Sequence, residues 1–174
     1  MRRHLDTFCS QSRAALQGQP LDLALPLIAG HLQDLLASDE FVAATFDDDT
    51  PAGKRLLHRD DATGFLVLAH VQAAGKGGAP HDHGASWAVY GNARGRTDMT
   101  EYRRVNDALE AHAVWMPQTR YSLHSGQTRA YPSGTVHATA HPEKAWVLRI
   151  TGTDLDQIPR YRFRKAVDTL LGGA

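Results

Sequence analysis

The amino-acid sequence predicts a mainly β chain, a sandwich or barrel of short strands that follows two helices. From Gly53 onward the helical spacing of apolar residues disappears, and short strand-like segments alternate with turns rich in glycine and proline. Two blocks of this region, residues 80–91 and 126–137, combine histidine with glycine and proline. We expect these two blocks to carry the function of the protein.

Residues 1–46 are expected to form a helical collar packed on the barrel. Apolar side chains recur at near-helical spacing over residues 4–17, and Gly18 ends the pattern. After Pro20 a second apolar series continues to about Ser38, with Pro26 as a candidate kink inside the helix. The acidic stretch 47–49 and the Thr50-Pro51 pair that follows it are expected to form a solvated connector.

Residues 53–174 are expected to form the barrel and a C-terminal helix, so that collar and barrel together make one structural domain. Turns are predicted at 60–61, 75–78 and 91–92, and a helix is predicted from Ile158 to Leu171. The predicted strands are Lys54–Arg59, Gly64–Gln72, Pro80–Tyr90, Arg94–Arg104, Ala111–Met116, Arg120–His124, Gln127–Tyr131, Thr135–Ala140 and Ala145–Gly152.

The composition favours a single domain without a nucleic-acid or membrane partner. A chain of 174 residues is long enough for one domain with a full-sized core. Lys plus Arg and Asp plus Glu each number 19, so no net charge attracts nucleic acid or an anionic membrane. No apolar run has the length of a membrane span, and no apolar segment follows the basic start as in a signal peptide. The lone Cys9 fits a reducing compartment, so we expect a cytoplasmic monomer or homodimer.

Three histidines are the candidate metal ligands. His81 and His83 are two residues apart, and side chains at that spacing share one face of an extended segment. His137 follows a turn at Pro132-x-Gly134, which would return a strand across the same interior. Neutral imidazole is the commonest metal ligand, and three neutral ligands would leave open positions on the ion. This ligand set leaves iron, zinc, nickel, copper and manganese open.

Both histidine blocks fit motifs of a known superfamily. Gly91 follows His83 by eight residues, and the spacing Gly126-x5-Pro132-x-Gly134-x2-His137 matches the second cupin block without a gap. Residues 53–152 resemble the cysteine dioxygenase family of cupins, which are thiol dioxygenases. The resemblance implies a jelly-roll barrel, one Fe(II) held by His81, His83 and His137, and O₂ as co-substrate. It also implies that a small thiol of the cysteine or 3-mercaptopropionate type is oxidised to its sulfinate.

The same resemblance suggests an anchor for the substrate. Arg55 lies on the strand where such enzymes keep an arginine for the substrate carboxylate, and a guanidinium binds a carboxylate bidentately. The alternative is a surface arginine on a half-exposed strand. His141 is a further candidate, as an acid or base four residues beyond His137, although Pro142 after it also fits a turn.

The last strand departs from the family. Val147, Arg149 and Thr151 stand where thiol dioxygenases usually carry a Ser-x-His-x-Tyr run. Alternation sets these three side chains on one face, so Arg149 is a second candidate anchor for an anionic substrate. The departure keeps other functions open: a three-histidine metalloenzyme for C–C cleavage, elimination or hydrolysis, or a cupin that binds a metal or ligand without turnover.

Overall fold

The computed structural model describes residues 2–106 and 113–159. Three helices come first: α1 (Arg2–Gly18), α2 (Leu21–Leu36) and α3 (Asp39–Thr45). The strands that follow are β1 (Gly53–Arg59), β2 (Leu66–Gln72), β3 (Lys76–Gly77), β4 (Ala88–Arg94), β5 (Thr97–Arg104), β6 (Trp115–Leu123), β7 (Thr128–Tyr131), β8 (Val136–His141) and β9 (Ala145–Thr151).

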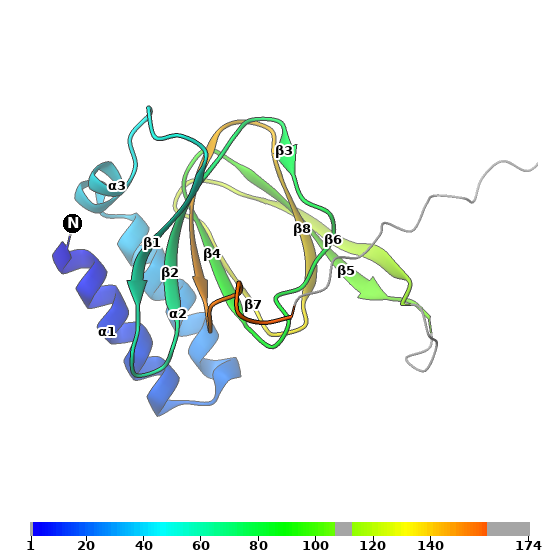
Figure 1. Ribbon diagram of the computed structural model, residues 1–174, viewed down its shortest axis with the longest axis horizontal. Coiled ribbons are helices and arrows are strands. Elements are labelled where there is room, and N and C mark those ends of the chain that lie inside the picture. Colours follow the sequence, from blue (N-terminus) through cyan, green and yellow to red (C-terminus); the bar gives the residue numbers. More distant parts are fainter. Residues whose placement is uncertain (1, 107–112, 160–174) are drawn as a thin grey trace, which may run out of the picture.

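The strands form two antiparallel sheets that face each other (Figure 1). One sheet has the order β1-β2-β9-β4-β7, and the other has the order β3-β8-β5-β6. Strand β9 therefore lies between β2 and β4, and β8 lies between β3 and β5, so neighbours in space are distant in sequence. The facing orders β2-β9-β4-β7 and β3-β8-β5-β6 are those of a jelly roll, with β1 added at one edge. The predicted fold class is confirmed.

The two faces of the five-stranded sheet have different partners. Val67, Ala69 and Val71 of β2 point outward and pack with Leu148 and Ile150 of β9 against the helices. Figure 1 shows the helices lying along this outer face. The alternate side chains point into the barrel, where a smaller core joins both sheets; it comprises Ala88, Tyr90, Met99, Leu123, Tyr131, Ala145 and Val147. No described helix is long and apolar enough to cross a membrane.

Two sequence-based boundaries in the collar and in β4 differ from the structure. Helix α3 was not expected; the hydroxyl of Ser38 caps it by accepting a hydrogen bond from the Phe41 amide at 3.2 Å. Gly91 and Asn92, predicted as a turn, lie inside β4. A Cβ at Gly91 would come within 2.6 Å of Leu36 Cδ1 and 2.8 Å of Leu32 Cδ2. The glycine is thus explained by the close approach of α2, and the turn lies at Gly95, where φ is +73°.

Three further predictions about the barrel need correction. The predicted segments Ala111–Met116 and Arg120–His124 contribute Trp115, Met116 and residues 120–123 to one strand, because Pro117 is accommodated in β6 at the sheet edge. Only the end of the predicted strand Pro80–Tyr90 is a strand, since β4 begins at Ala88. Within the predicted turn 75–78, Lys76 and Gly77 form the short strand β3. The predicted C-terminal helix lies almost entirely outside the described residues.

Candidate metal centre

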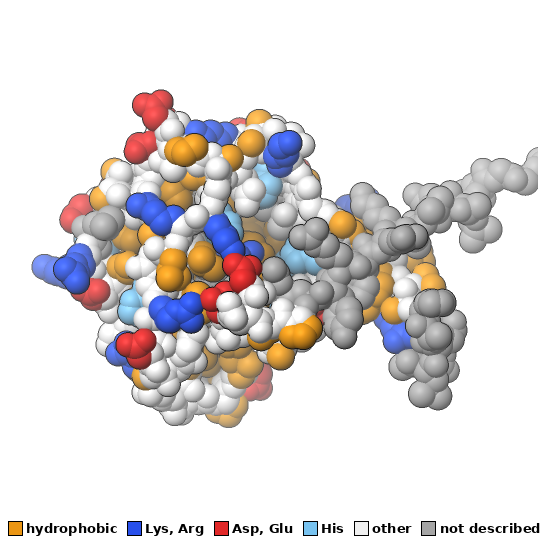
Figure 2. All heavy atoms as spheres, viewed as in Figure 1, with side chains coloured by type: hydrophobic (Ala, Val, Ile, Leu, Met, Phe, Trp, Pro, Cys, Tyr) orange, Lys and Arg blue, Asp and Glu red, His pale blue; other side chains and the backbone are white. Residues whose placement is uncertain are grey.

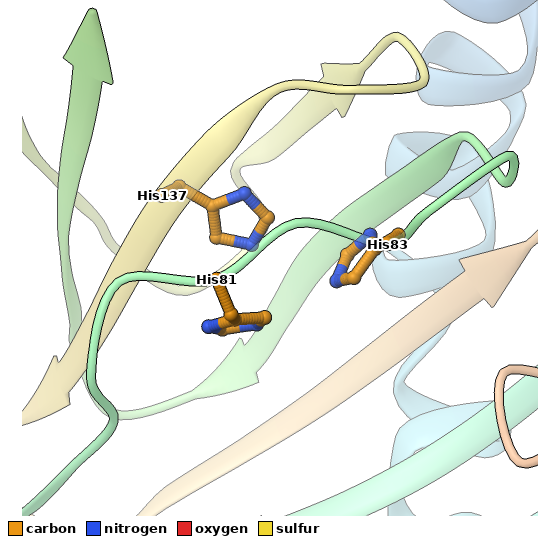
Figure 3. A group of neighbouring side chains, drawn as sticks. All are labelled: His81, His83 and His137. Atoms are coloured by element: carbon orange, nitrogen blue, oxygen red, sulfur yellow. The ribbon is translucent and has the colours of Figure 1, made fainter. Parts of the chain in front are cut away.

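The structure brings His81, His83 and His137 together inside the barrel. Their ligand nitrogens all lie within 4.8 Å of one another. His137 is on β8, whereas His81 and His83 come from the loop that precedes β4 (Figure 3). The backbones of His81 and His137 exchange two hydrogen bonds of 2.9 Å, which fix the loop against β8. After His81 the loop turns at Gly84, whose φ is +58° and whose amide donates to Asp82 Oδ1 at 3.0 Å.

The protonation of these histidines suits a metal ion. His137 is fully buried, and burial, followed by the neighbouring His81, lowers its pKa to about 3. It is therefore neutral at pH 7, and neither ring nitrogen has a hydrogen-bond partner in the described chain. Leaving such a group unpaired costs roughly 1–3 kcal/mol, which a metal–nitrogen bond would offset. His81 Nδ1 lies 3.0 Å from the carbonyl oxygen of Ala79, which assigns the proton to Nδ1 and leaves Nε2 to bind. The residues present fit a bound metal ion.

Aromatic residues that the sequence did not single out surround the three rings. The hydroxyl of Tyr90 lies 3.3 Å from Nε2 of His83. The ring of Tyr131 stacks on His137 with centroids 4.6 Å apart and an interplanar angle of 28°. Both tyrosines occupy inward positions of β4 and β7. The cross-strand register pairs Ala88 of β4 with Tyr131 of β7. Only this register shows that the two tyrosine side chains point to the side of the sheet where the histidines lie.

Arg149 is a cation inside the barrel. It pairs in the ladder with Leu68 on one side and Tyr90 on the other, so its side chain projects from the inner face as the sequence predicts. Its charge helps, after burial, to lower the pKa values of His70 and His137, so the guanidinium lies near both rings. Among the described residues Arg149 has no ion pair, and its Nε is buried without a hydrogen-bond partner.

A small cavity of about 170 Å³ lies beside Arg149 on the inner face of β1, β2 and β9. The other cations in its lining are paired: Lys54 Nζ lies 2.5 Å from Asp156 Oδ2, and an Arg59 nitrogen lies 2.9 Å from Asp154 Oδ2. Figure 2 shows an opening between the two sheets with apolar side chains inside it and histidine at its rim. Within the described ranges, Arg149 is thus an uncompensated cation next to the candidate metal centre.

The structure does not bring Arg55 to this centre. Arg55 pairs with Ala69, which packs against the helices, so Arg55 projects from the outer face of the sheet. Its Nη2 donates to the carbonyl oxygen of Thr45 at 2.6 Å, at the end of α3. Of the two interpretations of Arg55, this position favours an arginine at the outer face over a substrate anchor, and Lys54 takes the inward position instead.

His141 faces the interior but lies away from the centre. It follows His137 by four residues on β8, or about 13 Å at the usual rise of a strand. Its Nδ1 lies 3.3 Å from Thr97 Oγ1, and burial lowers its pKa. This position does not support the predicted role of His141 as an acid or base at the metal. His70 is an inward residue of β2. Its buried Nε2 has no partner in the described chain.

A jelly-roll barrel with three histidines converging in its interior is an arrangement that can hold a metal ion. No family model matches the chain, and no curated protein matches it.

Solved structures with similar folds include proteins described as cupins. One is a cupin superfamily protein from Desulfitobacterium hafniense DCB-2, with 15% identity, 65% of this chain and 87% of that chain covered, and a TM-score of 0.47. Other similar structures are described differently: the DMSP lyase DddQ from Ruegeria pomeroyi DSS-3 shows 14% identity, coverage of 67% of this chain and 55% of that chain, and a TM-score of 0.46. KdgF from Halomonas sp. shows 13% identity, coverage of 65% and 91%, and a TM-score of 0.45. At these levels of similarity, none of these proteins assigns a metal, substrate or reaction to this chain.

Proposed function

We propose that this protein is an iron-dependent dioxygenase for a small acidic substrate, with a thiol acid as the first choice. The observation that carries the proposal is the uncompensated Arg149 on the same inner surface as the three histidines. Neutral ligands leave a divalent ion its full charge, and Arg149 adds another positive charge. An interior of this kind favours a ligand with one or two negative groups.

The residues of the chain would bind and orient that ligand. The guanidinium of Arg149 offers paired donors to a carboxylate, and this contact would place the other end of a short molecule at His81, His83 and His137. Tyr131 and Leu68 line the interior and restrict water around the ligand. When bound, a ferrous ion would bring the substrate sulfur and O₂ together and would let electrons pass from sulfur to O₂. The overall reaction is balanced, since a thiol and one O₂ contain all the atoms of the sulfinic acid.

A second candidate is an elimination reaction on an acidic substrate at the same centre. The hydroxyl of Tyr90 lies 3.3 Å from the imidazole of His83, close enough to a bound substrate to exchange a proton with it. The last strand carries Val147 and Thr151 at the positions where thiol dioxygenases have polar groups. These two observations make an elimination with proton transfer by Tyr90 the second candidate. A third possibility is a barrel that binds metal or ligand without turnover.

Oxygen consumption separates the three possibilities. Protein loaded with Fe(II) under anaerobic conditions is given cysteine, 3-mercaptopropionate or cysteamine, and O₂ uptake and sulfinate are measured. We expect uptake with a carboxylate-bearing thiol, weaker uptake with cysteamine, and none in the His137→Ala variant. Protein that contains iron but consumes no O₂ with any thiol would refute the thiol dioxygenase. Product from an acidic substrate without O₂ consumption would then establish the elimination reaction.

A further inference from the structure

A chain of hydrogen-bonded side chains lies next to His137 and has no place in the proposed reaction. Glu101 of β5 is the ladder partner of His137 of β8, so both project from the inner face. The Tyr121 hydroxyl donates to Glu101 Oε1 at 2.7 Å, and the hydroxyls of Tyr121 and Tyr131 are 2.6 Å apart. Tyr131 in turn stacks on the ring of His137. This series of hydrogen-bonded side chains thus begins at Glu101, on the strand beside His137, and ends at Tyr131, on the face of the His137 ring.

Proton counting gives this chain a direction. A tyrosine hydroxyl has one hydrogen, and that of Tyr121 is donated to Glu101, so Tyr121 accepts the hydrogen of Tyr131. Glu101 ends the chain as a carboxylate, which also accepts from Arg129 Nη2 at 3.2 Å. The guanidinium of Arg129 lies 5.1 Å from the centre of the Tyr121 ring. Each hydroxyl hydrogen therefore has one defined acceptor, and the ring of Tyr131 is held in one orientation.

His137 needs such a support because it lacks the usual one. A metal-binding histidine normally donates its second nitrogen to a carboxylate or carbonyl group, which fixes the plane of the ring. The backbone of Thr135 lies close enough to His137 to raise its pKa somewhat against the effect of burial, but neither ring nitrogen makes a hydrogen bond of normal geometry in the part of the chain that the structure describes. The stacked ring of Tyr131 covers one face of His137 at 4.6 Å, while Tyr90 meets the same imidazole edge-on at a centroid distance of 5.7 Å.

We propose that Tyr131, held by Tyr121 and Glu101, is a positioning residue that fixes the ring of His137 for metal binding. This inference rests on the proposed metal centre and assigns a role to residues that do not touch the ion. The contribution of such outer partners to metal affinity is typically 10- to 100-fold. Breaking the chain should therefore weaken metal binding without removing a ligand.

The test is the affinity of the purified protein for Co(II), read from the visible absorption of the bound ion, in Tyr121→Phe. This change removes the central hydroxyl and keeps the ring. We expect the Kd to rise about tenfold or more and the absorption bands to shift as the ligand geometry relaxes. The matched control is Tyr102→Phe, which removes a hydroxyl at an outward position of β5, and it should bind Co(II) as the wild type does.

Two variants of Glu101 check that the chain itself is responsible. Glu101→Gln keeps an oxygen that accepts from Tyr121 and should retain most of the affinity, whereas Glu101→Leu should behave like Tyr121→Phe. Unfolding is followed in parallel by circular dichroism without metal. If Tyr121→Phe lowers the melting temperature but leaves Kd and spectrum unchanged, the residue is merely structural and the inference is overturned. Equal losses in the Tyr102 control would overturn it as well. A wild type that binds no Co(II) would overturn the metal centre itself, and the inference with it.

Discussion

Replacing Arg149 should make the protein more stable and less able to bind its substrate. In Arg149→Met the charge is lost, while the methionine side chain remains long and apolar enough to fill much of the space. The Nε of Arg149 is buried without a partner in the described chain, and an unpaired buried donor costs roughly 1–3 kcal/mol. We therefore expect the free energy of unfolding of the metal-free variant to rise by about 1 kcal/mol or more.

The effect on binding has the opposite sign. A hydrogen bond to a charged group contributes roughly 1.5–3 kcal/mol, and a factor of ten corresponds to about 1.4 kcal/mol, so losing the carboxylate contact predicts roughly a 10- to 150-fold weaker interaction. Steady-state kinetics with a carboxylate-bearing substrate should show this loss mainly in KM. A substrate that lacks the carboxylate should be much less affected, because it never uses the guanidinium.

Arg120→Met is the control for this experiment, since Arg120 is an exposed arginine on β6. Urea denaturation and kinetics on both variants separate the two effects. An Arg149→Met variant that is less stable than the wild type would show that the guanidinium has a structural partner. Unchanged KM values for every accepted acidic substrate would refute Arg149 as the anchor.

Three further predictions concern stability and metal binding. Asp60 is fully buried; burial raises its pKa, but hydrogen bonds from Arg13 and Thr63 outweigh this and lower it from 3.8 to about 2. Because the pKa of Asp60 is lower in the folded state, this stabilisation is present above pH 4 and is lost as pH falls towards 2. In urea denaturation at pH 7, Asp60→Asn should lower the free energy of unfolding by about 2 kcal/mol. A loss that is just as large at pH 2 would contradict the ion pair. Gly91→Ala should lower the free energy of unfolding by roughly 1–3 kcal/mol, because the new Cβ would contact α2. The control Gly18→Ala should not lower it, because a Cβ there meets nothing within 4 Å. Equal melting temperatures for the two variants would disprove this packing. Fe(II) or Co(II) at 100 times its Kd should add about 2.7 kcal/mol to the free energy of unfolding of the wild type. His83→Ala should not gain this stability from the metal. The same gain in that variant would show that the ion binds elsewhere.

The jelly roll could be predicted because turns and strands leave local signals, and the errors arose where packing overrode them. A glycine followed by asparagine is a common turn signal, yet Gly91 is inside β4 because α2 leaves no room for a Cβ. In the same way, the run from Trp115 to Leu123 continues through Pro117, since an edge strand has no neighbour that requires the missing amide.

The candidate metal ligands could be predicted, but the reason for their convergence could not. Alternation along a strand was expected to place His81 and His83 on one face, whereas both lie in a loop that pairs with His137 through its backbone. The sequence left two positions open for Arg55 because the face of the sheet depends on register. Ala69 and His70 are adjacent in β2, and pairing Arg55 with Ala69 turns Arg55 outward and Lys54 inward.

The inner and outer faces of the five-stranded sheet divide stability from function. Outward residues such as Val67 and Ile150 bury apolar surface against the helices, which is the larger of the two cores. Because this outer core supplies much of the stabilisation, the inner face can carry polar atoms that a folded chain would otherwise avoid, including His70 Nε2, both nitrogens of His137 and Arg149 Nε. These atoms belong to β2, β8 and β9, which share one interior, and a single anionic ligand with a bound metal ion could satisfy several of them together. The unpaired polar groups are therefore better explained by what the barrel binds than by what holds it together.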